Sequence, residues 1–166
     1  MSFVDALLPE FDREMAVTRR LLERVPDGQF AWQPHPKSMT LGRLAEHLAE
    51  LPHWAGVTVT EDGIDMGTGR PAGYQPPATR EAVLAMFDAN VTQARAALVG
   101  RADAELMAPW TLSHGGRTVF TMPKVAVLRS FVFNHLIHHR GQLSVYLRMH
   151  DVPLPSMYGP SADEAL

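Results

Sequence analysis

The stretch Asn134–Leu143 reads NHLIHHRGQL and places three histidines on a segment with helical apolar spacing. Residues four apart lie on one face of a helix, so His135 and His139 can bind one ion together. His138 lies about 100° from His139 around a helix axis. We interpret it as a flanking residue, the alternative being that it replaces His139 as a ligand. The apolar residues that share the face of His135 and His139, and so point both toward an interior, are Phe131, Val132, Leu143 and Tyr146.

Prolines divide the rest of the chain into windows long enough for helices, because proline disrupts a helix interior. Apolar residues recur in each window at the three-to-four spacing of an amphipathic helix. Ser38 or Thr40 and Thr79 are expected N-caps, and Gly100 is an expected stop. This pattern predicts an all-α four-helix bundle. The windows are Glu10–Val25 with a start nearer Ser2, Lys37–Leu51, Ala78–Ala108 and Lys124–Val152.

Two connections are too long for simple hairpins, namely His53–Pro77 and Arg101–Met122. Connections of this length favour crossovers over an up-down-up-down arrangement. Within the second, Trp110–Phe120 alternates around Gly115-Gly116, which predicts a small β-hairpin between the third and fourth helices. Neither a repeat nor a linker is visible, so we expect residues 1–166 to form one helical bundle domain.

Composition restricts the classes of function. Hydrophobic residues make up 46% and charged residues 20%, which is typical of a globular chain. The formal net charge of −3, without a basic patch, argues against a nucleic-acid partner. We find neither a run of the roughly 20 apolar residues that a membrane span needs nor a signal peptide, so we expect a cytoplasmic protein. Cysteine is absent, so any metal must be bound by His, Asp or Glu.

A third metal ligand is available in the second window. His47 lies at the edge of an apolar stripe formed by Leu44, Leu48 and Leu51. Helix bundles commonly assemble metal sites from side chains on facing helices. Three histidines leave a fourth coordination position open, as catalytic zinc sites do. Glu50, one turn beyond His47, is a candidate to orient a ligand or to act as base, and so is Glu46. We take Glu50 and the flanking residue His138 as the candidate catalytic residues.

Several neighbours of these histidines allow two interpretations. Arg140 and Gln142 anchor a substrate carboxylate or tune the site, but Arg140 also fits a surface position or an interhelical ion pair. Gly141 costs about 1 kcal/mol in mid-helix, so we expect another helix or a ligand to approach it closely. His53 and His114 face the site from its mouth or are ordinary loop residues. The tryptophans cover the pocket or anchor the core: Trp32, Trp54 and Trp110.

Three segments together resemble the DinB-like (damage-inducible) family of metal-dependent enzymes. They are Ser38–Glu50 placed after Trp32-Gln-Pro34, Asn134–Leu143, and the tail Val152–Glu164. The resemblance implies a four-helix bundle of crossed connectivity, often a homodimer. It also implies a divalent metal, zinc or nickel, on the histidines at His47, His135 and His139. Some relatives are similar to S-transferases that use low-molecular-weight thiols.

The sequence thus leads to two hypotheses. The first is a metal-dependent enzyme, an S-transferase or hydrolase acting on a small molecule, with a low-molecular-weight thiol as the cosubstrate of the transferase. The second is a non-catalytic metal-binding module, such as a stress-response bundle whose metal is structural.

Overall fold

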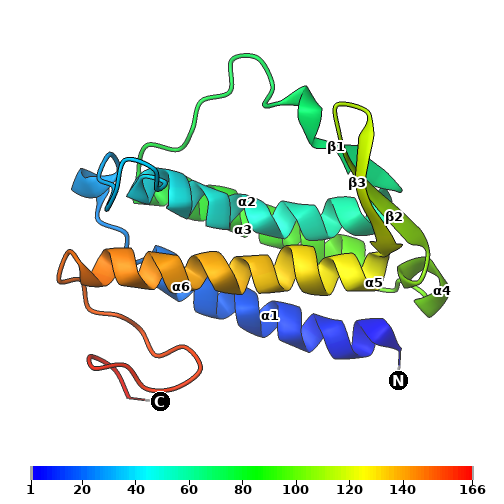
Figure 1. Ribbon diagram of the computed structural model, residues 1–166. Coiled ribbons are helices and arrows are strands. Elements are labelled where there is room, and N and C mark those ends of the chain that lie inside the picture. Colours follow the sequence, from blue (N-terminus) through cyan, green and yellow to red (C-terminus); the bar gives the residue numbers. More distant parts are fainter. Residues whose placement is uncertain (1, 166) are drawn as a thin grey trace.

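Four long helical stretches lie side by side in the computed structural model, which describes residues 2–165 (Figure 1). The prediction of a four-helix bundle is confirmed, with a small sheet added at one end. Shorter elements are η1 (Asp27–Gln29), η2 (Met66–Thr68) and α4 (Asp103–Leu106). The long stretches are α1 (Phe3–Leu22), α2 (Leu41–Thr60), α3 (Arg80–Leu98) and a composite of α5 (Lys124–Val127), the π-helical segment η3 (Leu128–Phe133) and α6 (Asn134–Arg148).

The helices α1, α2 and α3 begin at hydroxyl caps, because hydroxyl side chains satisfy backbone N–H groups that a first turn leaves free. Ser2 forms a capping box with Asp5 at the start of α1. The Thr40 hydroxyl accepts a hydrogen bond from the Arg43 amide, and Thr79 caps α3 in the same way. Thr40, and not Ser38, is therefore the cap of α2. The helix α3 ends at Leu98, two residues before Gly100, whose φ of 78° stops the helical path.

The expected end of the second helix at Leu51 is wrong, because α2 continues through Pro52 to Thr60. Proline lacks the N–H that would bond to the carbonyl four residues earlier. The Asn90 side-chain amide of α3 donates to the neighbouring Ala49 carbonyl at 2.8 Å and connects this turn of α2 to α3. Packing supports the extra turns, since several of their residues are buried: Pro52, Ala55, Thr58 and Val59. Tertiary contacts thus outweigh the local cost of the proline.

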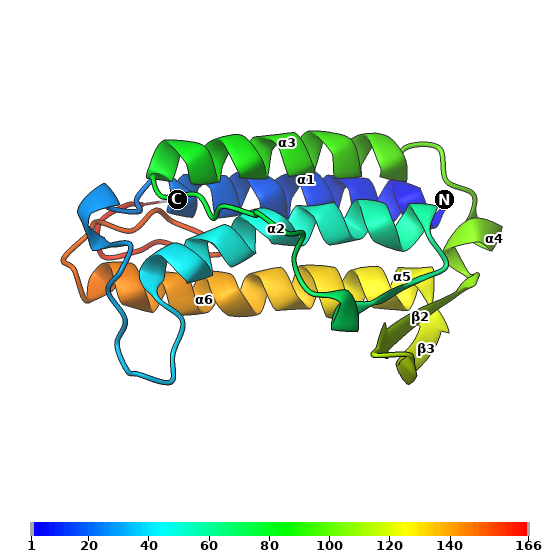
Figure 2. The same ribbon diagram turned by 90° about the horizontal axis from the view of Figure 1, so that it is seen from above.

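Contacts between helices give the direction of each one. Asn90 of α3 meets Ala49 of α2, and Ala94 lies against Gly56, so α2 and α3 run parallel. The connection between them, residues 61–79, therefore crosses the length of the bundle, as Figure 2 shows. The connection from α3 to α5 stays at one end and holds the predicted hairpin. One of the two long connections is a crossover and the other is an insertion.

The sheet has the order β1-β2-β3, with β1 (Gly63–Asp65), β2 (Pro109–His114) and β3 (Arg117–Pro123). The predicted hairpin is confirmed: β2 and β3 pair antiparallel around Gly115-Gly116. Both glycines have positive φ, 58° and 76°, as a type I′ turn requires. The sequence did not predict β1, which pairs parallel with β2. The Asp65 carboxylate joins β1 to the turn by accepting the amides of Gly67, Gly115 and Gly116.

The apolar stripes predicted from sequence form the core. Leu44, Leu48 and Leu51 of α2 are buried, as are Val132, Leu136, Leu143 and Leu147 of the last helix. A smaller cluster under the sheet contains Trp110, Leu112 and Val127. Among the described residues, the helices are all too short or too polar to cross a membrane.

Candidate metal centre

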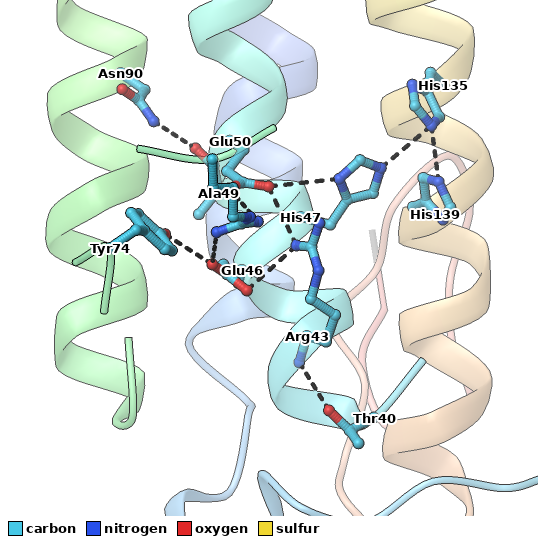
Figure 3. Close-up of polar contacts among 11 residues, drawn as sticks. Thr40, Arg43, Glu46, His47, Ala49, Glu50, Tyr74, Asn90, His135 and His139 are labelled. Atoms are coloured by element: carbon cyan, nitrogen blue, oxygen red, sulfur yellow. Dashed lines mark hydrogen bonds and ion pairs between the residues drawn. The ribbon is translucent and has the colours of Figure 1, made fainter. Parts of the chain in front are cut away.

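The three predicted ligands meet between α2 and α6 (Figure 3). These helices run antiparallel, so that Trp54 of α2 packs on Phe131 while His47 reaches His135 and His139. The Nε2 atom of His135 lies 3.3 Å from Nε2 of His47 and 2.8 Å from Nε2 of His139. One ring nitrogen from each of the three lies within 4.8 Å of the others. The arrangement thus presents three nitrogen donors to a common point.

The other ring nitrogen of each histidine faces a hydrogen-bond acceptor. Nδ1 of His139 lies 2.7 Å from Oε1 of Gln142, and Nδ1 of His47 lies 3.7 Å from Oε2 of Glu50. His135 hydrogen-bonds the backbone of Phe131, in the π-helical segment. Acceptors at Nδ1 favour the tautomer that carries its proton there. In that tautomer the three Nε2 lone pairs point at one another, an arrangement that a cation relieves.

Burial favours the neutral imidazoles of His135 and His139. It lowers the pKa of His139 to about 4, against a contact with Gln142 that raises the pKa, and the neighbouring histidines lower the pKa further. Burial and the charge that His47 would carry likewise lower the pKa of His135. Metal ligation requires the neutral form of histidine. At neutral pH, His135 and His139 are therefore in the state that binds metal.

The donor set fits a divalent transition metal. Nitrogen ligands about 2.0–2.1 Å from a tetrahedral zinc are about 3.3 Å apart. The His47–His135 separation of 3.3 Å matches this value, and the His135–His139 separation of 2.8 Å is shorter. Imidazole suits zinc and nickel, among other borderline metals. The three ring nitrogens are therefore placed to hold one metal ion.

A cavity of about 750 Å³ opens beside His47. Apolar side chains form much of its wall, including Trp54, Met66 and Met86. Polar side chains gather on the side of α2, where Arg43 and Glu50 line it. Pockets of this size and character take small molecules. A ligand in this cavity would lie next to His47, the member of the histidine cluster that lines it.

Sequence reasoning singled out Glu46 and Glu50 of α2 but missed the side chains that bind these carboxylates. Glu46 is 2% exposed, and its carboxylate is contacted by Arg43, by Arg70 at 2.6 Å and by the Tyr74 hydroxyl at 2.7 Å. Burial pushes the pKa of Glu50 upward, but contacts with His47, Arg43 and Arg70 outweigh it, so that its pKa lies below the ordinary value. Burial and Glu46 raise the pKa of Tyr74. The signal available in the sequence was the spacing of Arg43, Glu46 and Glu50, three and four residues apart on one helix.

The other residues of α6 that the sequence singled out differ in exposure and in contacts. His138 is exposed, and its ring lies 4.9 Å from that of His139. Arg140 is 1% exposed and forms the interhelical ion pair with Glu14 at 2.6 Å, so it is neither a surface residue nor free for a substrate. The expected close approach to Gly141 is wrong, because a Cβ there would meet no atom within 4 Å and the position is exposed.

The remaining aromatic and loop candidates separate by their distance from the cavity. Trp54 and the exposed His53 line it. Trp32 packs on Tyr146 and His150, and Trp110 is fully buried under the sheet, so both serve the core. His114 is exposed at the hairpin and is not part of the cavity wall.

Comparisons with known proteins agree with this fold. The family model described as the DinB family matches residues 1–165. An uncharacterized protein of Bacillus subtilis (strain 168), YrdA, is 27% identical over 97% of this chain and 91% of its own length. A DinB-like protein from Bacillus cereus ATCC 10987 has a TM-score of 0.70 at 22% identity, covering 93% of this chain and 97% of its own. The DinB-like protein YjoA from Bacillus subtilis has a TM-score of 0.71 at 18% identity, covering 92% of this chain and 96% of its own.

Proposed function

The chain belongs to the DinB family, and from this membership and its histidine cluster we propose a metal-dependent enzyme that acts on a small molecule. His47, His135 and His139 would bind one divalent ion, zinc or nickel, through their Nε2 atoms. The observation that carries the proposal is the convergence of three Nε2 atoms, with a hydrogen-bond acceptor beside the other ring nitrogen of each histidine.

An ion held by three histidines lowers the pKa of a bound water or thiol and so supplies a nucleophile at neutral pH. The chain's own residues would prepare the site for it. Gln142 fixes the ring of His139, and Glu50 faces the ring of His47 on the side away from the cluster. This position supports an orienting role for Glu50 over that of a base. His138, exposed beside His139, is the candidate to exchange protons with solvent.

The cavity beside His47 supports an enzyme over a structural metal site. A structural site is closed by a fourth protein ligand. Among the described residues, the cluster contains three such groups and no fourth. The apolar wall at Trp54 and Met86 suits the carbon skeleton of a small substrate. Transfer to a low-molecular-weight thiol and hydrolysis are the two reactions that we propose. We also propose that the protein is a cytoplasmic homodimer, the homodimer being what the resemblance to the family implies.

The first test is the metal content of tag-free protein, measured by mass spectrometry for the parent, His47→Ala and His135→Ala. We expect near-stoichiometric zinc or nickel in the parent and loss of that metal in both variants. His114→Ala, at the exposed hairpin, is the matched control and should keep the metal. A parent that contains no metal and takes up neither zinc nor nickel would refute the site.

The second test addresses the reaction. The metal-loaded and metal-free proteins are compared for turnover of an electrophilic small molecule, with and without a low-molecular-weight thiol. Turnover that needs both metal and thiol supports a transferase, and turnover that needs only metal supports a hydrolase. Metal without turnover of either kind would favour the non-catalytic module.

A further inference from the structure

Residues 66–77, which we call the strap, form part of the cavity wall through Met66, Thr68, Gly69, Arg70, Pro71 and Tyr74. Figure 2 shows the connection from β1 to α3 running across α2. Helical structure in the strap ends at Thr68, after η2. Among the described residues, the side-chain hydrogen bonds and ion pairs that tie 69–77 to α2 come from Arg70 and Tyr74. The strap is therefore held to α2 by these two residues.

Arg70 binds two carboxylates at once. Nη1 donates to Oε1 of Glu46 at 2.6 Å, and Nη2 donates to Oε1 of Glu50 at 2.6 Å. The planar guanidinium lies over the Tyr74 ring, with Cζ 4.4 Å from the ring centroid. Glu46 and Glu50 are one helical turn apart and His47 lies between them in the sequence. The fork of Arg70 thus spans the part of α2 that presents a metal ligand.

Glu50 connects this clamp to the histidine. Its Oε1 is held by Arg70, and its Oε2 lies 3.7 Å from Nδ1 of His47. A carboxylate is planar, so fixing one oxygen also restricts the direction of the other. Arg43 contacts Oε2 as well, at 3.1 Å, and draws it toward the start of the helix. Without Arg70, no guanidinium would hold the other carboxylate oxygen of Glu50 against this contact with Arg43.

We propose that Arg70 is a positioning residue for the metal centre: it holds Glu50 against Nδ1 of His47 and so keeps Nε2 directed at His135 and His139. This role rests on the proposed function for the identity of the ligands. In this role, Arg70 couples the attachment of the strap to α2 with the binding of metal by the histidines. A strap that leaves α2 weakens metal binding, and by linkage a bound metal resists the release of the strap.

An anion receptor is the competing role for these arginines, and the charges disfavour it. The cavity and its immediate support contain Arg43 and Arg70 against Glu46, Glu50 and Asp65. Among these five residues, acidic charges exceed basic ones. Both guanidiniums already contact carboxylates. The arginines therefore serve the acidic residues of α2 more readily than they serve an incoming anion.

Zinc affinity of tag-free protein, measured by competition with a chromophoric chelator, tests the role. We expect Glu50→Gln to weaken zinc binding about tenfold, the lower end of the effect of residues that orient a ligand. Arg70→Met should weaken it in the same direction, and the double variant should bind no more weakly than Glu50→Gln alone. Arg70→Lys should restore part of the loss. Arg95→Met, which removes an exposed arginine paired with Asp12, is the matched control and should change nothing.

A second readout needs no metal. In metal-free protein, the ring-nitrogen chemical shifts of His47 report which nitrogen carries the proton. Arg70→Met should shift the population from Nδ1–H toward Nε2–H. Tyr74→Phe removes a strap contact to Glu46 and none to Glu50, so it should leave the His47 signals in place.

Unchanged His47 shifts in Arg70→Met would overturn the inference, and so would additive effects of Arg70→Met and Glu50→Gln on affinity. A parent without affinity for zinc or nickel would refute the proposed metal function instead. The shifts of His47 would still decide whether Arg70 positions the ring.

Discussion

Glu14→Gln and Arg140→Met are each expected to destabilise the protein by about 3 kcal/mol. The two side chains connect α1 to α6 within the core, with exposed fractions of 6% for Glu14 and 1% for Arg140. Nη2 of Arg140 lies 2.6 Å from Oε2 of Glu14. The tail residue Tyr158 donates to the same carboxylate at 2.7 Å. Either substitution leaves a polar or charged partner in the core without its counterpart.

The magnitude follows from what remains after each change. Removing one member of a buried ion pair costs about 3–5 kcal/mol, because the other charge stays desolvated. After Glu14→Gln, Arg140 still donates to the main-chain carbonyl of residue 14 at 3.2 Å and to the Thr18 hydroxyl at 3.1 Å. These remaining hydrogen bonds favour the lower end of the range of costs. A chain of this length loses about 2–4 °C of melting temperature per kcal/mol, so about 3 kcal/mol corresponds to about 6–12 °C.

Urea and thermal denaturation of chelator-treated protein, followed by helical circular dichroism, measure these costs. Arg129→Met is the matched control, because Arg129 pairs with Glu10 at the surface with an exposed fraction of 48%. Exposed pairs contribute about 0–1 kcal/mol. Replacing both core partners, as Glu14→Leu with Arg140→Met, should recover much of the loss. The reasoning fails if Arg140→Met costs no more than Arg129→Met.

Three further outcomes are expected. The metal-free protein should lose stability as the pH falls from about 6.5 toward about 4. The pKa of His139 is about 4 in the folded protein and 6.5 in the unfolded chain, so the unfolded chain binds more protons in this range. Urea midpoints measured across the range should therefore fall with pH, His139→Gln should reduce this dependence, and midpoints that do not change with pH would contradict it. Gly141→Ala should stabilise the protein by about 1 kcal/mol in thermal melts, since its Cβ meets open space in mid-helix, and a loss would contradict the open environment. Gly63→Ala should destabilise it by about 1–3 kcal/mol, since its Cβ would lie 2.3 Å from the Thr111 carbonyl oxygen; an unchanged melting temperature would show that the strand pair adjusts.

Local signals were sufficient for most of the fold. Thr40 and Thr79 cap their helices because a hydroxyl next to an apolar-periodic run has a local physical role. The Gly115-Gly116 turn was predictable for the same reason, since two adjacent positive φ values favour glycine. Such features depend on a few neighbouring residues. They can be predicted without knowing what packs against them.

The errors arose where distant residues decide the local structure. Pro52 indicates a helix end by itself, but Asn90 and the buried residues after Pro52 support a continuous α2. The strand Gly63–Asp65 has three residues and exists because it pairs with β2, nearly fifty positions away. The π-helical segment Leu128–Phe133 has no sequence signature of its own. The continuation of α2 and the strand β1 depend on tertiary contacts that the sequence pattern does not encode locally.

The candidate ligands could be predicted from local spacing, but the residues that contact the carboxylates beside them could not. His135 and His139 share a helix face, so their spacing alone places them together, and His47 required only a facing helix. Arg70 and Tyr74, by contrast, come from a segment without periodicity, and their partners could not be inferred from spacing.

The helix α2 connects the candidate ligands to the residues that support them, because its consecutive turns contact different parts of the molecule. Leu44 and Leu48 pack into the core and hold the helix in place. His47 faces α6 and is a candidate metal ligand, while Glu46 and Glu50 face the strap. A change in the strap therefore reaches His47 through a single turn of a well-packed helix. Because the core fixes the backbone of that turn, the rotation of side chains is the remaining freedom, and the hydrogen bonds of the carboxylates restrict it.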